Sequence, residues 1–219
     1  MEPSTDLIEV PSGTVVLNDR RTSRQWSVPV STFRLSPTHV TQSLYAAVTG
    51  SSPSTAPGAE LPVETVSWSD AVRFCNTLSA NEGLTPAYRI GSASDVVWDR
   101  DADGYRLPAE AEWEHACRAG TDGPRYGALG DIAWYRDNSG ERIHEVGGKA
   151  ANGWGFHDML GNAWDWCWDV YDAEVYGDYR VLRGGGWFDE HWSCRASVRR
   201  RSHPDLRIED VSFRLARNA

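Results

Sequence analysis

Tryptophan and glycine are unusually abundant in this chain, and they set the first limits on its fold. The 219 residues include 11 Trp and 20 Gly. Indole side chains are among the largest that a core can bury, and glycine allows tight turns that other residues resist. Since no internal repeat or linker is visible, the pattern indicates a single loop-rich domain over residues 1–219 with an indole core. It argues against a helix bundle.

The charge balance and the lack of long apolar runs exclude several functional classes. The chain has 31 Asp+Glu against 22 Lys+Arg, a formal net charge of −9, which argues against nucleic acid as the main partner. No apolar run approaches the roughly 18 residues that a membrane span needs, so we expect no membrane insertion. The segment Met1–Asp6 lacks the basic and apolar regions of a secretory signal, so we expect a cytoplasmic location.

Alternating apolar and polar residues predict strands at both ends of the chain. The runs Val10–Leu17 and Trp26–Leu35 fit half-buried strands, and Val211–Arg217 fits a closing strand. Pro29 in the second run favours an edge strand. The spacing over Val40–Val48 predicts a short helix.

Two further helices carry recognisable end signals. Ser67–Asp70 has the spacing of a capping box, and we expect the helix to reach about Leu78. Pro108–Ala119 begins with proline and acidic residues and ends with arginine before Gly120, as a helix of that polarity requires. Its predicted core face comprises Leu107, Ala111, Trp113, Ala116 and Cys117. Between Gly120 and Gly186 we find no long periodic element.

Two acidic stretches raise the question of calcium. Asp99–Gly104 with Glu110 matches an EF-hand loop in spacing, but the preceding residues are strand-like, so we interpret it as an Asp/Gly turn. In Asn152–Asp169, two carboxylates bracket a Gly-Asn turn whose carbonyls can point inward. That arrangement favours an oxygen cage of the calcium type, or else a turn in which Asp and Asn only bind backbone amides. The candidate ligands are Asp158, Gly161, Ala163 and Asp165.

The cysteines and histidines do not have the spacing of a zinc site, because no CxxC, HxxxH or HExxH pair occurs. We expect Cys75, Cys117 and Cys167 to be buried thiols. Cys194 lies in an arginine-rich segment, where nearby guanidinium groups could lower its pKa. It is therefore the one candidate catalytic residue, although the pattern favours a buried structural thiol here as well.

Four arginines follow Cys194 at short spacing. They could form an anion site, or they could pair with the acidic residues of the same region. The arginines are Arg195, Arg199, Arg200 and Arg201, and the possible acidic partners are Asp189, Glu190, Asp205, Glu209 and Asp210.

Short motifs in a fixed order, spread over nearly the whole chain, resemble the formylglycine-generating enzyme family, also called sulfatase-modifying factors. They are Leu61–Trp68, Gly104–Glu114, Gly161–Trp166, Leu182–Trp187 and Ser212–Arg214. The resemblance implies an α+β, C-type-lectin-like fold with a twisted antiparallel sheet, two main helices and much irregular loop.

The family's oxidases convert a sulfatase cysteine to formylglycine and bind copper through two thiolates, which the resemblance places at this chain's C-terminal segment. In register, the second thiolate falls on Cys194, the first falls on Asp189, and a preceding serine position holds Gly186. A two-thiolate copper site needs two soft ligands. We therefore expect neither bound copper nor formylglycine generation.

The family's calcium site corresponds to the oxygen cage already described, and the resemblance implies a side chain, two backbone carbonyls and a second carboxylate as its ligands. We therefore expect structural Ca²⁺ held by Asp158, Gly161, Ala163 and Asp165.

The segment Gly184–Arg217 also resembles the variable region of diversity-generating retroelement targets, which use the same fold. This implies an exposed binding face for an unknown protein or small-molecule ligand, over a framework that includes Trp187, Arg195, Arg199 and Pro204, with Trp187 and Phe213 buried beneath. The predicted face spans Phe188–Ser193 and Ser202–Asp210. Its candidate binding residues are Phe188, Asp189, Glu190, His191, Ser193, Ser202, His203, Leu206 and Ile208.

Several functions remain open at this point. The chain could be a calcium-stabilised binding module without oxidase activity. It could be a metal-dependent oxidoreductase acting on a cysteine or small molecule through Cys194, Asp189 or a histidine (His191, His203). It could also be an immunity or regulatory protein. The missing thiolate pair favours the binding module or the immunity or regulatory protein.

Overall fold

Short strands in several small sheets, with helices packed beside them, make up the fold in this computed structural model, which describes residues 6–91 and 95–219. The expected absence of a secretory signal concerns Met1–Asp6, and residues 1–5 lie outside the described ranges. The strands are β1 (Ile8–Val10), β2 (Gly13–Asp19), β3 (Arg24–Val30), β4 (Phe33–Leu35), β5 (Tyr88–Ile90), β6 (Val96–Trp98), β7 (Trp164–Val170), β8 (Arg180–Arg183), β9 (Arg199–Ser202), β10 (Val211–Ser212) and β11 (Ala216–Asn218). The helices are α1 (Gln42–Thr49), α2 (Trp68–Asn81), α3 (Glu110–Arg118), α4 (Leu129–Ile132) and α5 (Ala173–Tyr176).

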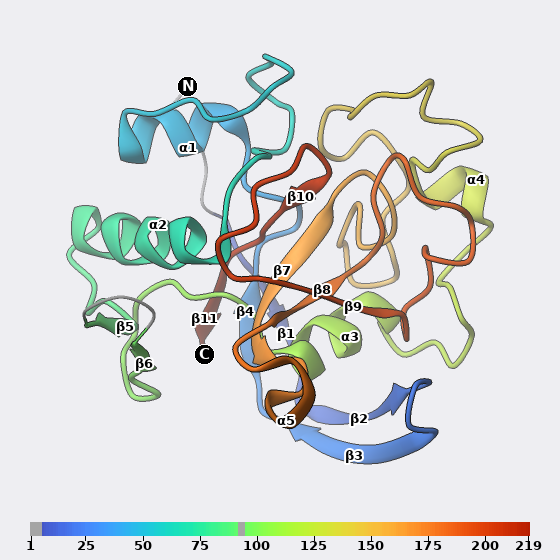
Figure 1. Cartoon of the computed structure of the whole chain (residues 1–219), viewed down its shortest axis with the longest axis horizontal. Helices are drawn as coiled ribbons and strands as arrows, with labels where there is room; N and C mark the ends of the chain where they lie inside the picture. Colours follow the sequence, from blue (N-terminus) through green and yellow to red (C-terminus); the bar gives the residue numbers. More distant parts are fainter. Residues whose placement is uncertain (1–5, 92–94) are drawn as a thin grey trace.

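The sheet that organises the molecule has the strand order β10-β7-β8-β9, with β10 parallel to β7 and the other pairs antiparallel. A second sheet, β1-β4-β11, joins the two ends of the chain. Figure 1 shows β7 running through the middle, with α1 and α2 to one side and the β2–β3 hairpin at the bottom of the view. This α+β arrangement agrees with the expected fold class.

Indole side chains form much of the core, as the tryptophan count predicts. Trp68, Trp113, Trp164 and Trp166 are among the largest fully buried side chains. One apolar cluster packs α1 and α2 against the central sheet, and a second packs α3 against the β2–β3 hairpin.

The helix predictions hold, with small changes at the ends. In α2 the Ser67 hydroxyl accepts from the Asp70 N–H and the Asp70 carboxylate accepts from the Ser67 N–H, which is the predicted capping box. In α3 the N-cap is Ala109, and Glu112 binds its N–H at 2.8 Å, so Pro108 precedes the helix rather than opening it. All five residues predicted to face the core from this segment are buried.

Each long strand predicted at the ends of the chain is in fact two strands. β1 and β2 are separated at Pro11–Ser12, and β3 ends at Val30, before β4 begins at Phe33. In the C-terminal run, β10 and β11 are separated by Phe213–Leu215, whose side chains are buried. The alternation was present, but the chain changes sheets within each run.

Strand β7 lies in the region where no long periodic element was expected. Its first four residues are buried on both faces, so the period-two signal of a half-buried strand is absent. The EF-hand spacing does not correspond to a calcium loop: β6 precedes it, and Glu110 binds the side chains of Arg183 and Arg199. None of the helices in residues 6–91 and 95–219 has the length and apolar character needed to cross a membrane.

Candidate binding cleft and buried carboxylate centre

The predicted calcium residues and the predicted binding face lie on opposite faces of the β7–β9 sheet. Successive residues of a strand point to opposite sides, so Trp164 and Leu182 face one way, and Asp165 and Arg183 the other. We call the site on the first face the cleft and the site on the second face the carboxylate centre. The carboxylate centre consists of Asp158, Gly161, Ala163 and Asp165.

The loop before β7 is held in a tight, largely left-handed path. Asp158, Gly161 and Asn162 have φ values of 52°, 78° and 64°. A Cβ atom at Gly161 would lie 2.3 Å from the Trp134 carbonyl oxygen, so only glycine fits there. The Asn162 amide exchanges two hydrogen bonds of 3.0 Å with the backbone of His144, which fixes the turn.

At the carboxylate centre, Asp165 is buried and bound by two donors. Its Oδ2 accepts from Trp113 Nε1 at 2.8 Å and from Arg214 Nε at 2.9 Å. The buried His39 ring lies 3.0 Å from the Ala163 carbonyl oxygen through Nε2. Burial lowers the pKa of His39 despite the nearby carboxylate of Asp165, so this ring is neutral and donates to the carbonyl.

Asp158 has no comparable cationic partner. Its Oδ2 accepts from the Gly147 N–H at 2.7 Å, but it forms no ion pair with any described residue. Asp158 Oδ1 and Asp165 Oδ1 are both buried without a hydrogen-bond partner in this part of the chain. Arg214 therefore pairs with Asp165 and reaches only the main-chain carbonyl of Asp158, and one oxygen of each carboxylate is left without a hydrogen bond.

This donor set fits a hard cation. The atoms without a partner are carboxylate oxygens, and the Ala163 carbonyl oxygen beside Asp165 is bound by His39. Carboxylate and carbonyl oxygens are the ligands that Ca²⁺ prefers. Among the described residues no cluster of three or more His, Cys, Asp or Glu side chains could hold a metal ion. A calcium ion here would therefore depend on the two carboxylates and on backbone oxygens together.

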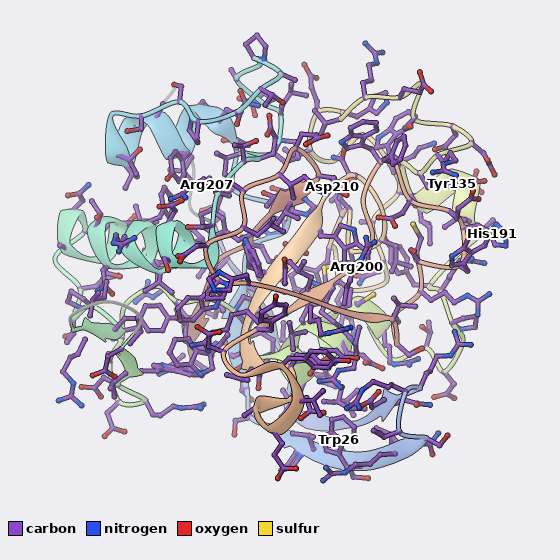
Figure 2. All side chains as sticks on the ribbon, in the orientation of Figure 1. Trp26, Tyr135, His191, Arg200, Arg207 and Asp210 are labelled. Carbon is purple, nitrogen blue, oxygen red and sulfur yellow. The ribbon has the colours of Figure 1, made fainter. Side chains whose placement is uncertain are left out.

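On the opposite face, most of the predicted binding residues line one cleft of about 670 Å³. Its lining includes Phe188, Asp189, Glu190, Ser193, Ser202, Leu206 and Ile208. His191 and His203 are exposed but do not line it. Figure 2 places His191 at the outer edge of the molecule, well apart from Arg200 and Asp210, which do line it.

Large apolar side chains are exposed around this cleft. Phe188 and Trp192 are each 53% exposed, and Ile208 is 37% exposed. Phe213 is buried, as expected. Trp187 is only half-buried, because its indole lies near the surface and its Nε1 is 3.3 Å from the Glu209 carbonyl oxygen.

Several lining residues were not predicted for this face. Trp192 lies inside the predicted segment, and its large aromatic side chain among polar residues was a usable signal. Asp210 ends the second predicted segment of the face but was not among its candidate binding residues, and Arg200 was recognised only as a member of a charge cluster. Arg136 and Trp164 reach the cleft from distant parts of the chain, and nothing in their local sequence pointed there.

The second of the two alternatives, pairing with acidic residues of the same region, holds for only one of the four arginines, Arg200. Arg199 binds Glu110 at 2.8 Å, and Arg200 Nη1 lies 3.4 Å from Asp189 Oδ1. Arg201 stacks over the Tyr176 ring at 3.7 Å.

Cys194 is fully buried, and burial together with the charge of Asp189 raises the pKa of its thiol to about 12. The favoured interpretation as a buried thiol is confirmed, and the possible lowering of the pKa by arginines does not occur, because Arg125 opposes these effects only in part. Asp189, at the position of the first copper thiolate, accepts from Trp164 Nε1 at 2.6 Å and from the Gly186 N–H at 2.9 Å. These residues do not fit a two-thiolate copper site.

Comparison with known proteins identifies the family. Residues 1–219 match the sulfatase-modifying factor enzyme 1-like domain. The chain belongs to this family of formylglycine-generating-enzyme-like proteins, and its fold is the C-type-lectin-like fold of that family.

Individual relatives are similar over most of this chain. The structure of Treponema denticola variable protein 1 has a TM-score of 0.89 and 31% identity, covering 97% of this chain and 95% of its own. Chaperone protein LppX of Paenibacillus barcinonensis is 32% identical, over 84% of this chain and 79% of its own length. Inactive C-alpha-formylglycine-generating enzyme 2 of Mus musculus is 29% identical, over 73% of this chain and 50% of its own length.

Proposed function

We propose that this protein is a non-catalytic binding module that holds a protein or small-molecule ligand in the cleft. The observation that carries the proposal is the convergence of exposed Phe188, Trp192 and Ile208 on one concave surface. Contiguous exposed apolar side chains around a cleft are typical of interaction sites.

The chemistry of Cys194 and Asp189, which stand at the positions of the two copper thiolates, supports binding rather than oxidation. Cys194 is a buried thiol with a pKa near 12, and Asp189 is committed to Trp164 and Gly186. The thiolate, not the thiol, binds copper and attacks substrates. The names of the relatives, one a variable protein, one a chaperone and one an inactive enzyme, agree with a family in which the scaffold serves purposes other than oxidation.

We also propose that Ca²⁺ occupies the carboxylate centre as a structural ion. It would satisfy the orphaned oxygens of Asp158 and Asp165 and offset the carboxylate charge that Arg214 leaves unbalanced. The ion would brace the loop before β7, from which Trp164 enters the floor of the cleft.

Selection from a library of displayed random peptides tests the cleft. We expect wild-type protein to retain peptides that the double variant Phe188→Ala, Trp192→Ala does not retain. The matched control is Val175→Ala, because Val175 is 56% exposed on α5, away from the cleft lining. Equal retention by the wild type and the double variant would contradict the proposal.

Oxygen uptake tests the oxidase alternative. After copper loading, the protein should consume no oxygen with a cysteine-containing peptide. Uptake that stops in Cys194→Ser would overturn the non-catalytic assignment.

A further inference from the structure

The cleft contains one carboxyl group without an ion pair. Arg136 pairs with Glu190, and Arg200 pairs with Asp189. Asp210 also lines the cleft but forms no ion pair among the described residues. An acidic side chain that is partly withdrawn from water and lacks a cation is unfavourable, so a cation brought by a ligand would be stabilised there.

Gly186 makes room for this carboxyl group. A Cβ atom at position 186 would lie 3.0 Å from Asp210 Cβ, 3.1 Å from Asp210 Oδ2 and 3.3 Å from Trp164 Cδ1. A methyl group at this position would force Asp210 to shift by a few tenths of an ångström. The glycine therefore leaves room for the carboxyl group next to Trp164, whose ring lies under the Arg200 guanidinium.

The surroundings of Asp210 suit a cation better than an anion. Burial and the charge of Asp189 raise the pKa of Asp210 to about 6, while Arg200 acts in the opposite direction. The carboxylates of Asp189 and Glu190 are used within the protein, by Trp164 and Arg136 respectively. Asp210 is thus the acidic group of the cleft left to a ligand.

The exposed apolar groups indicate what accompanies that cation. Phe188, whose ring already has the Arg136 guanidinium over it, and Trp192 offer exposed aromatic surface, and Ile208 adds an aliphatic surface. Half-exposed aromatic side chains with arginine nearby are typical of protein interfaces rather than of enclosed small-molecule sites.

We propose that the cleft binds a peptide segment of a partner protein in which a lysine or arginine side chain pairs with Asp210 and a neighbouring bulky apolar residue packs on Phe188 and Trp192. The proposal rests on the binding function of the cleft and specifies its ligand. Asp210 supplies the charge recognition, and Gly186 places it.

The experiment is a selection of displayed random peptides lacking histidine on wild-type protein, Asp210→Asn and Asp205→Asn. The control Asp205→Asn makes the same charge change on the same loop, but outside the cleft lining. We expect wild type and the control to enrich peptides with a basic residue next to a bulky apolar one. A resynthesised peptide should bind Asp210→Asn at least about tenfold more weakly, as expected for a lost charged hydrogen bond.

Two further measurements sharpen the assignment. Gly186→Ala should weaken the same peptide, because its methyl group displaces Asp210. Binding to wild type should weaken as the pH falls from about 7.5 to about 5, since the cation favours ionised Asp210, and this change should vanish in Asp210→Asn. The charged groups that act on Asp210 in this range are Asp189, Arg200 and Glu209.

The outcomes separate this inference from the proposed function. Peptides that need Phe188 and Trp192 but contain no basic residue, or that bind Asp210→Asn equally, would overturn the inference and leave the binding module intact. Enrichment of acidic peptides would overturn it in favour of Arg200 as the anchor. Failure of wild type to retain any peptide more than the Phe188→Ala, Trp192→Ala variant would overturn both.

Discussion

Arg183 and Arg200 lie on neighbouring strands of one sheet but belong to different environments. Arg183 points toward α3, is fully buried, and binds both Glu114 and Glu110. Arg200 pairs with Leu182 across the strands, so its side chain lies on the opposite face, where it is 56% exposed and forms a long ion pair of 3.4 Å with Asp189. One face of the sheet is held by buried ion pairs, while the other carries charges that can change partners.

This difference means that charges in the cleft can be changed at less cost to the fold than charges beneath the sheet. A buried ion pair cannot lose one partner without leaving a charge in the core, whereas an exposed pair exchanges with water at little cost. The ion pairs beneath the sheet are therefore fixed parts of the fold, whereas the exposed Arg200–Asp189 pair above it can change partners.

The largest expected effect is on the buried face. Arg183→Met should lower the free energy of unfolding by about 3–5 kcal/mol, because Glu114 and Glu110 lose their shared partner in the core. Urea denaturation monitored by tryptophan fluorescence measures it. A change of less than about 1 kcal/mol would show that the two faces do not differ as described.

Removal of calcium should have the next largest effect. If Ca²⁺ binds the carboxylate centre, an ion present at a hundredfold excess over its Kd stabilises the fold by about 2.7 kcal/mol. Chelation should therefore lower the Tm of the wild type but not that of Asp158→Asn or Asp165→Ala. Equal responses in all three proteins would rule out this centre as the binding site.

A carboxyl with a raised pKa allows a comparison of the two faces by pH. Burial raises the pKa of Asp169 to about 6, and its Oδ2 accepts from the Glu110 N–H at 2.6 Å. Because the folded state holds this proton more tightly than the unfolded state, stability should fall as the pH rises from about 4 to about 6.

Asp169→Asn should remove part of that fall and stabilise the protein at pH 7 by on the order of 2 kcal/mol. Asp210→Asn gives the corresponding measurement for the cleft face, where burial also raises the pKa to about 6. Denaturation curves across this pH range test both. If the stability of the wild type rises with pH over this range, and the stability of neither variant falls, the assigned direction of the pKa shift is wrong.

The smallest effect is expected for the exposed arginine. Arg200→Met should change the free energy of unfolding by less than about 0.5 kcal/mol, since its ion pair with Asp189 is exposed and long. The same denaturation assay applies. A loss comparable to that of Arg183→Met would remove the distinction between a fixed face and an adaptable one.

Local sequence signals predicted the elements whose formation depends on neighbouring residues. The Ser67 and Asp70 capping pair lies within one helical turn, so its spacing alone identifies the start of α2. The buried face of α3, including Trp113, follows from helical periodicity. The order of the family motifs indicated the fold, because those motifs correspond to its recurring structural positions.

Other features depend on contacts between distant residues, and no local pattern reveals them. Strand β7 is buried on both faces, so its sequence does not alternate. Arg214 reaches Asp165 across 49 residues, and Arg136 joins the cleft from outside the predicted segment. The sequence by itself determined the capped helices, the indole core and the family. The tertiary structure decided which charges are paired in the core, that Cys194 is buried as a thiol, and that Asp210 lines the cleft without an ion pair. The physical reason is that capping and periodicity act within a few residues, while burial and ion pairing depend on what the rest of the chain places nearby.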